Sequence, residues 1–129
     1  MRKEIPDLVR QKTLLVLDDL PSARKIVTRF LHRLGFDDVL EASSLQEARD
    51  VLEEEKLVLI IADIHLKDGL GFSLMDVLKK QQQDIPILFI TSDLDPQSLC
   101  LTLHLGQKMD YLLKPFSDQI LAAKIGDLF

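Results

Sequence analysis

Residues 57–62 read LVLIIA and are followed directly by Asp63. An apolar run this short, without polar alternation, is typical of a strand that is buried on both faces of a parallel sheet. Two further runs have the same character, residues 13–17 (TLLVL) and residues 85–90 (IPILFI). The sequence therefore predicts a buried parallel sheet with these three strands in its interior.

Between and beyond these runs, weaker strands alternate with helical patterns. Residues 38–42 (DVLEA) and 110–113 (DYLL) are the weaker strands. The predicted helices cover residues 22–34, a segment that begins at Ser44 with Glu47 in a capping box, residues 72–80, and a segment capped by Ser117. Alternation of strand and helix predicts an α/β fold, a doubly wound five-stranded parallel sheet flanked by helices on both faces.

Residues 98–105 (SLCLTLHL) fit this scheme less directly. They alternate between apolar and polar residues, which is a strand pattern. Their place in the strand–helix order nevertheless requires a helix, and we expect one there.

The composition bounds the kind of protein. A chain of 129 residues suits a single domain over 1–129, and we expect residues 1–12 to be a charged N-terminal extension. There are 16 Lys and Arg against 21 Asp and Glu, a net charge of -5. This balance argues against nucleic acid as a direct partner, because phosphate backbones require basic patches.

The cysteine content and the absence of long apolar runs bear on location. Cys100 is the sole cysteine, so no disulfide can form within the chain, and we expect it to be a small buried hydrophobic residue. Residues 1–12 are charged and have no apolar h-region, so we expect no signal peptide. No apolar run approaches the ~20 residues that cross a bilayer. The predicted location is cytoplasmic, away from membranes.

Polar residues follow each of the three buried runs. They are Asp18 and Asp19 after the first, Asp63 after the second, and Thr91 and Ser92 after the third. Ligands of open parallel α/β sheets bind at the carboxyl ends of the strands, so these side chains are expected to meet at one edge. Taken singly, each could be an ordinary turn or helix-cap residue; the combination is what indicates a site.

The chemistry of this set favours phosphoryl transfer. Carboxylates held close together repel one another, and Mg²⁺ relieves that repulsion through oxygen ligands. Lys114, at the end of the last predicted strand, offers positive charge to a phosphoryl group, and a hydroxyl offers a hydrogen bond. An aspartate can itself be the nucleophile.

Four segments of the chain resemble the receiver domain of two-component response regulators. They are LLVLDDLPSAR, LIIADIHLKDGLG, PILFITSD and DYLLKPF, and the resemblance covers about residues 13–129. It implies the flavodoxin-like receiver fold of CheY-like proteins and a phosphorylation-dependent signalling switch.

The resemblance also implies a role for individual residues. Asp63 is similar to the phosphoacceptor, and Thr91 and Lys114 to the catalytic hydroxyl and lysine. The implied Mg²⁺ ligands are Asp18, Asp19, Asp63 and the backbone carbonyl of His65, with Asp19 a more direct ligand than Asp18. Thr91 and Tyr111 resemble the residues that change conformation after phosphorylation, and Lys114-Pro115 resembles a cis-proline junction.

Two departures from the family pattern stand out. Lys67 occupies a position where many members carry proline. The stretch GQKMDY, which ends at Tyr111, is one residue longer than usual, and it belongs with residues 98–105 to the region where receivers usually present their output surface.

The implied partners are a histidine kinase or phosphotransfer protein, an output domain or protein, and a second copy through the face formed by residues 98–129. The alternative is a phosphorylation-independent interaction or dimerisation module, which the leucines of residues 98–105 favour. A small aspartyl-phosphate hydrolase is a third class. Such enzymes often carry a second Asp two residues after the nucleophile, where this chain has His65, so we expect no enzyme acting on a separate substrate.

Overall fold

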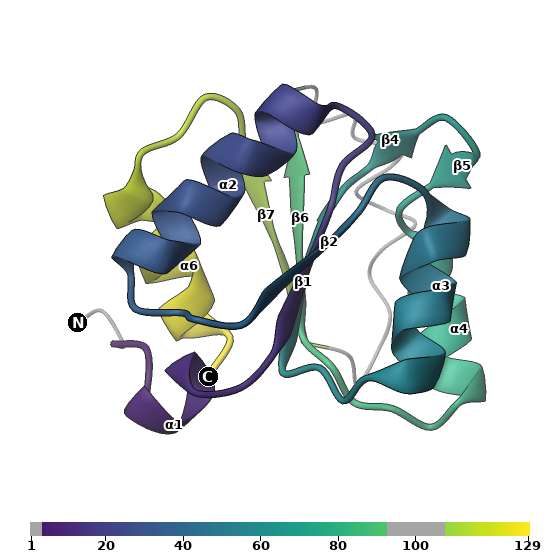
Figure 1. Cartoon of the computed structure of the whole chain (residues 1–129), viewed down its shortest axis with the longest axis horizontal. Helices are drawn as coiled ribbons and strands as arrows, with labels where there is room; N and C mark the ends of the chain where they lie inside the picture. Colours follow the sequence, from purple (N-terminus) through teal and green to yellow (C-terminus); the bar gives the residue numbers. More distant parts are fainter. Residues whose placement is uncertain (1–3, 93–107) are drawn as a thin grey trace.

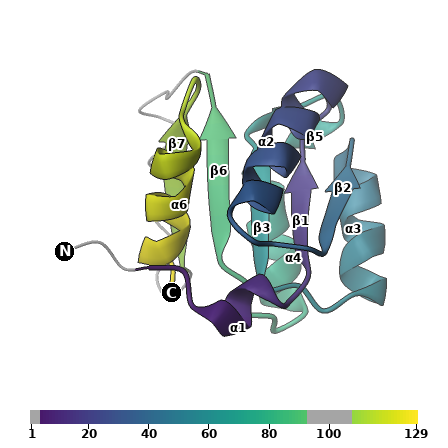
Figure 2. The same cartoon turned by 60° about the vertical axis from the view of Figure 1, so that its left-hand side comes forward.

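The computed structural model describes residues 4–92 and 108–129. Its parallel strands are β1 (Leu14–Leu17), β2 (Val39–Ala42), β3 (Leu59–Asp63), β6 (Ile87–Thr91) and β7 (Met109–Leu113). They form one five-stranded sheet in the order β2-β1-β3-β6-β7, which Figure 2 shows nearly face-on. β3, the strand that contains the central apolar run, lies in the middle of the sheet.

Helices cover both faces of this sheet. They are α2 (Pro21–Arg33), α3 (Leu45–Glu54), α4 (Ser73–Lys80) and α6 (Asp118–Asp127). Figure 1 shows α2 and α6 on one face and α3 and α4 on the other. The predicted doubly wound α/β architecture is confirmed, and the predicted and observed strand boundaries differ by at most two residues.

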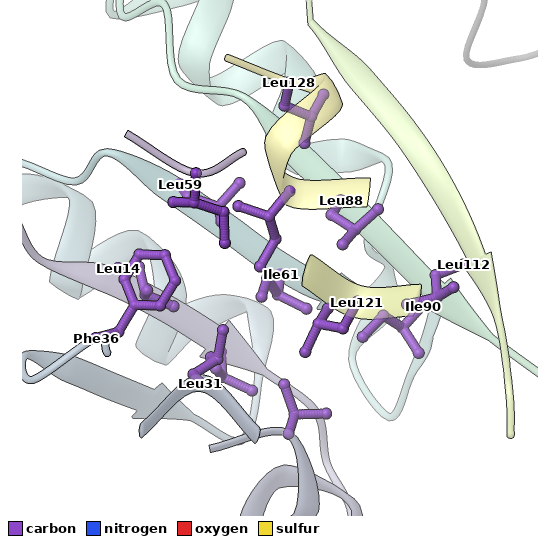
Figure 3. Packing of buried hydrophobic residues seen from close by; sticks show 14 of the residues in the cluster. Leu14, Leu31, Phe36, Leu59, Ile61, Leu88, Ile90, Leu112, Leu121 and Leu128 are labelled. Atoms are coloured by element: carbon purple, nitrogen blue, oxygen red, sulfur yellow. The ribbon is translucent and has the colours of Figure 1, made fainter. Parts of the chain in front are cut away.

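The two faces of the sheet carry separate apolar clusters. Leu14, Leu59 and Leu88, on three neighbouring strands, pack beneath α2 and α6 in the first cluster, which Figure 3 shows. Leu15 and Ile60, the residues that follow Leu14 and Leu59, belong to the second cluster beneath α3 and α4. Successive side chains of a strand point to opposite faces, and here both faces are buried. This double burial is why the strands are continuous apolar runs.

The predicted helix caps are also confirmed. The Ser44 hydroxyl accepts a hydrogen bond from the Glu47 amide at 3.1 Å, and the Glu47 carboxylate accepts one from the Ser43 amide at 2.8 Å. The Ser43 hydroxyl also donates to this carboxylate, at 2.9 Å. The Ser43 amide, and then the Ser43 hydroxyl, lower the pKa of Glu47. Ser117 caps α6 by accepting from the Ile120 amide at 3.2 Å.

Within residues 4–92 and 108–129, no helix is both long enough and apolar enough to cross a membrane. The helix expected over residues 98–105, with Cys100, lies outside the described residues.

The structure adds elements that the sequence pattern did not predict. A short helix, α1 (Asp7–Arg10), lies within the N-terminal extension. Two short strands, β4 (His65–Leu66) and β5 (Gly69–Leu70), form an antiparallel hairpin directly after β3. Both elements are too short to produce a recognisable periodicity, since a pattern needs a longer window to be distinguished.

The N-terminal extension packs against the domain. Ile5 and Val9 are buried in the first apolar cluster, and Figure 1 shows α1 at the end of the sheet where the strands begin. The Arg10 side chain donates from Nε to the Leu34 carbonyl at 2.8 Å. That carbonyl belongs to the end of α2, so the arginine supplies a partner to a carbonyl that the helix leaves free.

Ile5→Ala should therefore lower the free energy of unfolding by about 2–3 kcal/mol, because the truncation leaves a cavity beneath the sheet. Leu8→Ala is the matched control. Leu8 is 70% exposed, and its truncation should change the stability by less than about 0.5 kcal/mol. Urea denaturation of the two variants measures the difference, and equal stability would mean that the extension does not pack in solution.

Candidate functional site

The polar residues at the strand ends do share one edge of the sheet. Asp18 follows β1 directly, Asp63 ends β3 and Thr91 ends β6. The register pairs Leu17 with Ala62 and Asp63 with Ile90. Because the strands are parallel, their carboxyl ends face the same way and bring these side chains to one place.

Lys114 links two of these carboxylates. Its Nζ lies 3.1 Å from Asp18 Oδ2 and 3.2 Å from Asp63 Oδ2. The Asp18 and Asp63 side chains are 6% and 14% exposed, and that of Lys114 is 24% exposed. The lysine thus bridges two aspartates at the carboxyl ends of the neighbouring strands β1 and β3.

The second oxygen of each carboxylate binds the backbone. Asp18 Oδ1 accepts from the Leu20 amide at 2.9 Å, and Asp63 Oδ1 accepts from the His65 amide at 3.2 Å. Each carboxylate is therefore held at both ends, one oxygen on its own loop and the other on the lysine. This arrangement sets the orientation of Asp63 before any ligand arrives.

The carboxylates keep Lys114 charged. Burial by itself lowers the pKa of Lys114, but the charges of Asp18 and then Asp63 outweigh it, so the pKa is raised. An ammonium that stays protonated is suited to receive an anionic group at this edge of the sheet.

The backbone around Lys114 fixes where its side chain starts. The Lys114 amide donates to the Thr91 carbonyl at 2.9 Å, which extends the pairing of β6 and β7 beyond the strands. The Lys114-Pro115 bond is cis, as the resemblance implied. Thr91 itself is buried at the end of β6.

Arg24 supports the site, and the sequence reasoning missed it. Its Nη1 donates to the Asp18 carbonyl at 2.7 Å, and its Nε donates to Glu41 at 3.2 Å. The arginine, on α2, thereby joins the loop after β1 to the edge strand β2. Arg24 is the last residue of the segment LLVLDDLPSAR, but the sequence does not show which way its side chain points.

Gly71 closes the loop behind Asp63, and it too was missed. Its amide donates to the Ile64 carbonyl at 2.7 Å. A Cβ atom at this position would lie 2.3 Å from the Asp63 carbonyl oxygen. The backbone can approach Asp63 this closely only with glycine.

Tyr111 lies on β7 with its ring among other aromatic side chains. The ring centroid is 6.1 Å from that of Phe89 and 6.5 Å from that of Phe72, the latter in an edge-to-face arrangement. The residue as a whole is half-buried, whereas its hydroxyl oxygen is buried. Tyr111 therefore borders the apolar cluster beneath α3 and α4, one strand away from Thr91.

The donor set suits a divalent cation. The carboxylates of Asp18 and Asp63 share one cation, Lys114, and Asp19 follows Asp18 in the chain. Over residues 4–92 and 108–129, no three His, Cys, Asp or Glu side chains are close enough to hold a metal by themselves. Mg²⁺ does not need three, since it binds through one or two carboxylates and completes its octahedron with other oxygens.

An apolar groove lies beside the acidic residues. It has a volume of about 180 Å³ and is lined by Ala23, Ile26, Val27, Phe30, Lys114, Pro115 and Phe116. Ile26 is half exposed, and the rings of Phe30 and Phe116 meet edge to face with centroids 6.0 Å apart. Lys114 belongs both to this groove and to the carboxylate cluster, so a partner seated on α2 would reach the site.

Comparison with known proteins agrees with this geometry. The family model for the response regulator receiver domain matches residues 14–126. A chemotaxis protein CheY homolog of Campylobacter jejuni is 35% identical over 118 residues, which are 89% of this chain and 90% of that protein.

Longer proteins and solved structures match as well. The transcriptional regulatory protein GltR of Pseudomonas aeruginosa is 35% identical over 88% of this chain and 47% of its own length. The structure of the chemotaxis protein CheY4 of Vibrio cholerae superposes with a TM-score of 0.83 at 25% identity, covering 92% of this chain and 99% of that one. The chain belongs to the response regulator receiver domains, the signalling modules of two-component systems.

Proposed function

We propose that this receiver domain is a phosphorylation switch that accepts a phosphoryl group on Asp63 from a histidine kinase or a phosphotransfer protein. The observation that carries the proposal is the position of the Asp63 carboxylate, at the sheet edge and 3.2 Å from Lys114 Nζ. A carboxylate with a nearby fixed cation can attack an anionic phosphoryl group without prohibitive repulsion.

The transfer forms one bond and breaks another. A carboxylate oxygen of Asp63 attacks phosphorus in line, and the phosphorus–nitrogen bond of the donor phosphohistidine breaks. The electron pair of that bond returns to the donor imidazole, and Asp63 becomes an acyl phosphate. Positioning and charge stabilisation supply most of what this reaction needs. The domain thus promotes its own phosphorylation and dephosphorylation and turns over no separate substrate.

Each residue of the site has a separate role in the proposed transfer. Asp63 Oδ1 is held by the His65 amide, which leaves Oδ2 to attack as Lys114 shifts from that oxygen to the incoming phosphoryl oxygens. Asp18, Asp19, Asp63 and the His65 carbonyl would hold Mg²⁺, which when bound supplies the positive charge that the phosphoryl oxygens need. Arg24 keeps the Asp18 backbone in place.

The groove beside Lys114 is the proposed docking surface for the donor protein. Its lining is apolar apart from the lysine, which suits a docking helix whose phosphohistidine must reach Asp63. We propose that the donor covers Ile26 and Phe30 and places its imidazole above the carboxylates. A cytoplasmic location would bring the domain together with such a kinase.

Phosphorylation would alter the domain through Thr91 and Tyr111. The Thr91 hydroxyl would turn to an oxygen of the acyl phosphate, and the half-buried Tyr111 ring would move further into the cluster that contains Phe72 and Phe89. An output domain or protein that binds only this state would shift the population toward it. A second copy of the chain could be such a partner.

Intact mass spectrometry tests this function. The wild-type protein, incubated with acetyl phosphate and Mg²⁺, should gain the mass of one phosphoryl group. The gain should disappear with EDTA and be reversed by hydroxylamine, which cleaves acyl phosphates. No gain from acetyl phosphate or from a phosphorylated histidine kinase would contradict the proposal.

A further inference from the structure

The loop after Asp63 is tied to helix α3 by one side chain. The Asp68 carboxylate accepts from the Leu45 amide at 3.0 Å through Oδ1 and from the Gln46 amide at 3.3 Å through Oδ2. These two amides open α3 and have no partner within the helix. The third free amide, that of Glu47, donates to the Ser44 hydroxyl. Asp68, which is 23 and 22 residues away from Leu45 and Gln46 in the chain, supplies the acceptors for the first two.

A second contact joins the same two segments. Gly69 has a φ of +145°, and a Cβ there would lie 2.9 Å from a methyl group of Leu45. Leu45 is itself buried. The tip of the β4–β5 hairpin therefore rests directly on the first turn of α3, and the hydrogen bonds of Asp68 hold it there. The bond from the Leu45 amide also lowers the pKa of Asp68, so the carboxylate bonds in its charged form.

The other end of this loop leads into the functional site. His65 lies on β4, paired with Leu70, and its amide holds Asp63 Oδ1. Its carbonyl is the proposed metal ligand. The hairpin thus has His65 on its first strand and Asp68, which is hydrogen-bonded to α3, in its turn. A shift of the turn would therefore move the His65 carbonyl.

We infer that Asp68 is a positioning residue that sets the His65 carbonyl for Mg²⁺ by anchoring the β4–β5 hairpin to α3. The inference rests on the proposed function and adds a residue that touches neither the metal nor the phosphoryl group.

Isothermal titration of Mg²⁺ into the unphosphorylated protein tests this role. Asp68→Ala should weaken Mg²⁺ binding by about 10- to 100-fold, the usual cost of losing a residue that supports a metal ligand. Asp50→Ala is the matched control, because Asp50 is an exposed residue of α3 whose carboxylate accepts from the Gln46 side chain at 3.1 Å. It should bind Mg²⁺ like the wild type.

Two further variants separate positioning from general stability. Ile5→Ala should destabilise the domain without changing Mg²⁺ affinity. Lys67→Pro in the Asp68→Ala background should restore most of the affinity. Proline suits this position, since Lys67 is the first of two turn residues between Leu66 and Gly69 and is not among the described residues with positive φ.

The outcomes distinguish this inference from the proposed function. Equal Mg²⁺ affinity of Asp68→Ala and the wild type, or an equal loss in Ile5→Ala, would overturn the positioning role alone. Failure of Lys67→Pro to recover any affinity would also count against it. A wild-type protein that binds no Mg²⁺ would overturn the proposed metal site and the inference with it.

Discussion

Asp63→Asn should abolish phosphorylation by acetyl phosphate or by a phosphorylated donor protein, while the domain remains folded. The amide is nearly the same size as the carboxylate, and its oxygen can still accept from the His65 amide. It lacks the negative charge and the nucleophilic oxygen that form the acyl phosphate. Intact mass spectrometry should show no gain, and urea denaturation should show a midpoint close to that of the wild type.

The metal-free stability of this variant should stay close to that of the wild type. The substitution removes an ion pair with Lys114 but also removes one of two carboxylates that share the same cation, and these changes oppose each other. Asp76→Asn is the control, since Asp76 is an exposed residue of the first turn of α4. It should be labelled like the wild type. Labelling that persists in Asp63→Asn would assign the phosphoacceptor to another residue.

Lys114→Gln should slow phosphorylation by about 10²–10³-fold, the usual cost of removing one group that stabilises charge in a transition state. The same substitution should strengthen Mg²⁺ binding, because it removes a positive charge that lies 3.1 and 3.2 Å from two carboxylates. Effects of opposite sign on rate and on metal affinity are not produced by simple unfolding. Stopped-flow rates and Mg²⁺ titration measure the two quantities.

The metal-free variant should also lose stability, by about 1–3 kcal/mol, because the buried Asp18 carboxylate loses its charged partner. Added Mg²⁺ should recover much of this loss. Lys124→Gln is the matched control. Lys124 pairs with Asp110 at 3.2 Å, away from the functional edge, and both side chains are about one-third exposed. A wild-type phosphorylation rate in Lys114→Gln would remove the lysine from the mechanism.

The strands and the main helices follow from the sequence because their causes are local. Residues 57–62 are apolar at every position since β3 is buried on both faces, and such a run has few alternatives. Ser44 and Glu47 mark the start of α3 because both partners of the capping box lie within one turn. The order of strand and helix then brings Asp18, Asp63 and Thr91 to one edge.

Contacts between distant segments needed the tertiary structure. The short helix α1 gave no periodic pattern, and Ile5 and Val9 become core residues only because the extension folds back beneath the sheet. Arg24 reaches the Asp18 carbonyl, and Gly71 reaches the Asp63 carbonyl, through approaches that no spacing rule encodes. The anchor of Asp68 on Leu45 depends on where a hairpin tip meets a helix.

Burial and capping act between neighbours in the chain, so the architecture and the edge of the sheet with the candidate site could be predicted from the residues alone. The contacts that hold this edge together could not. Lys114 bridges Asp18 and Asp63, and Asp68 accepts hydrogen bonds from the first turn of α3. The packing of whole elements sets which of these groups come within hydrogen-bonding distance.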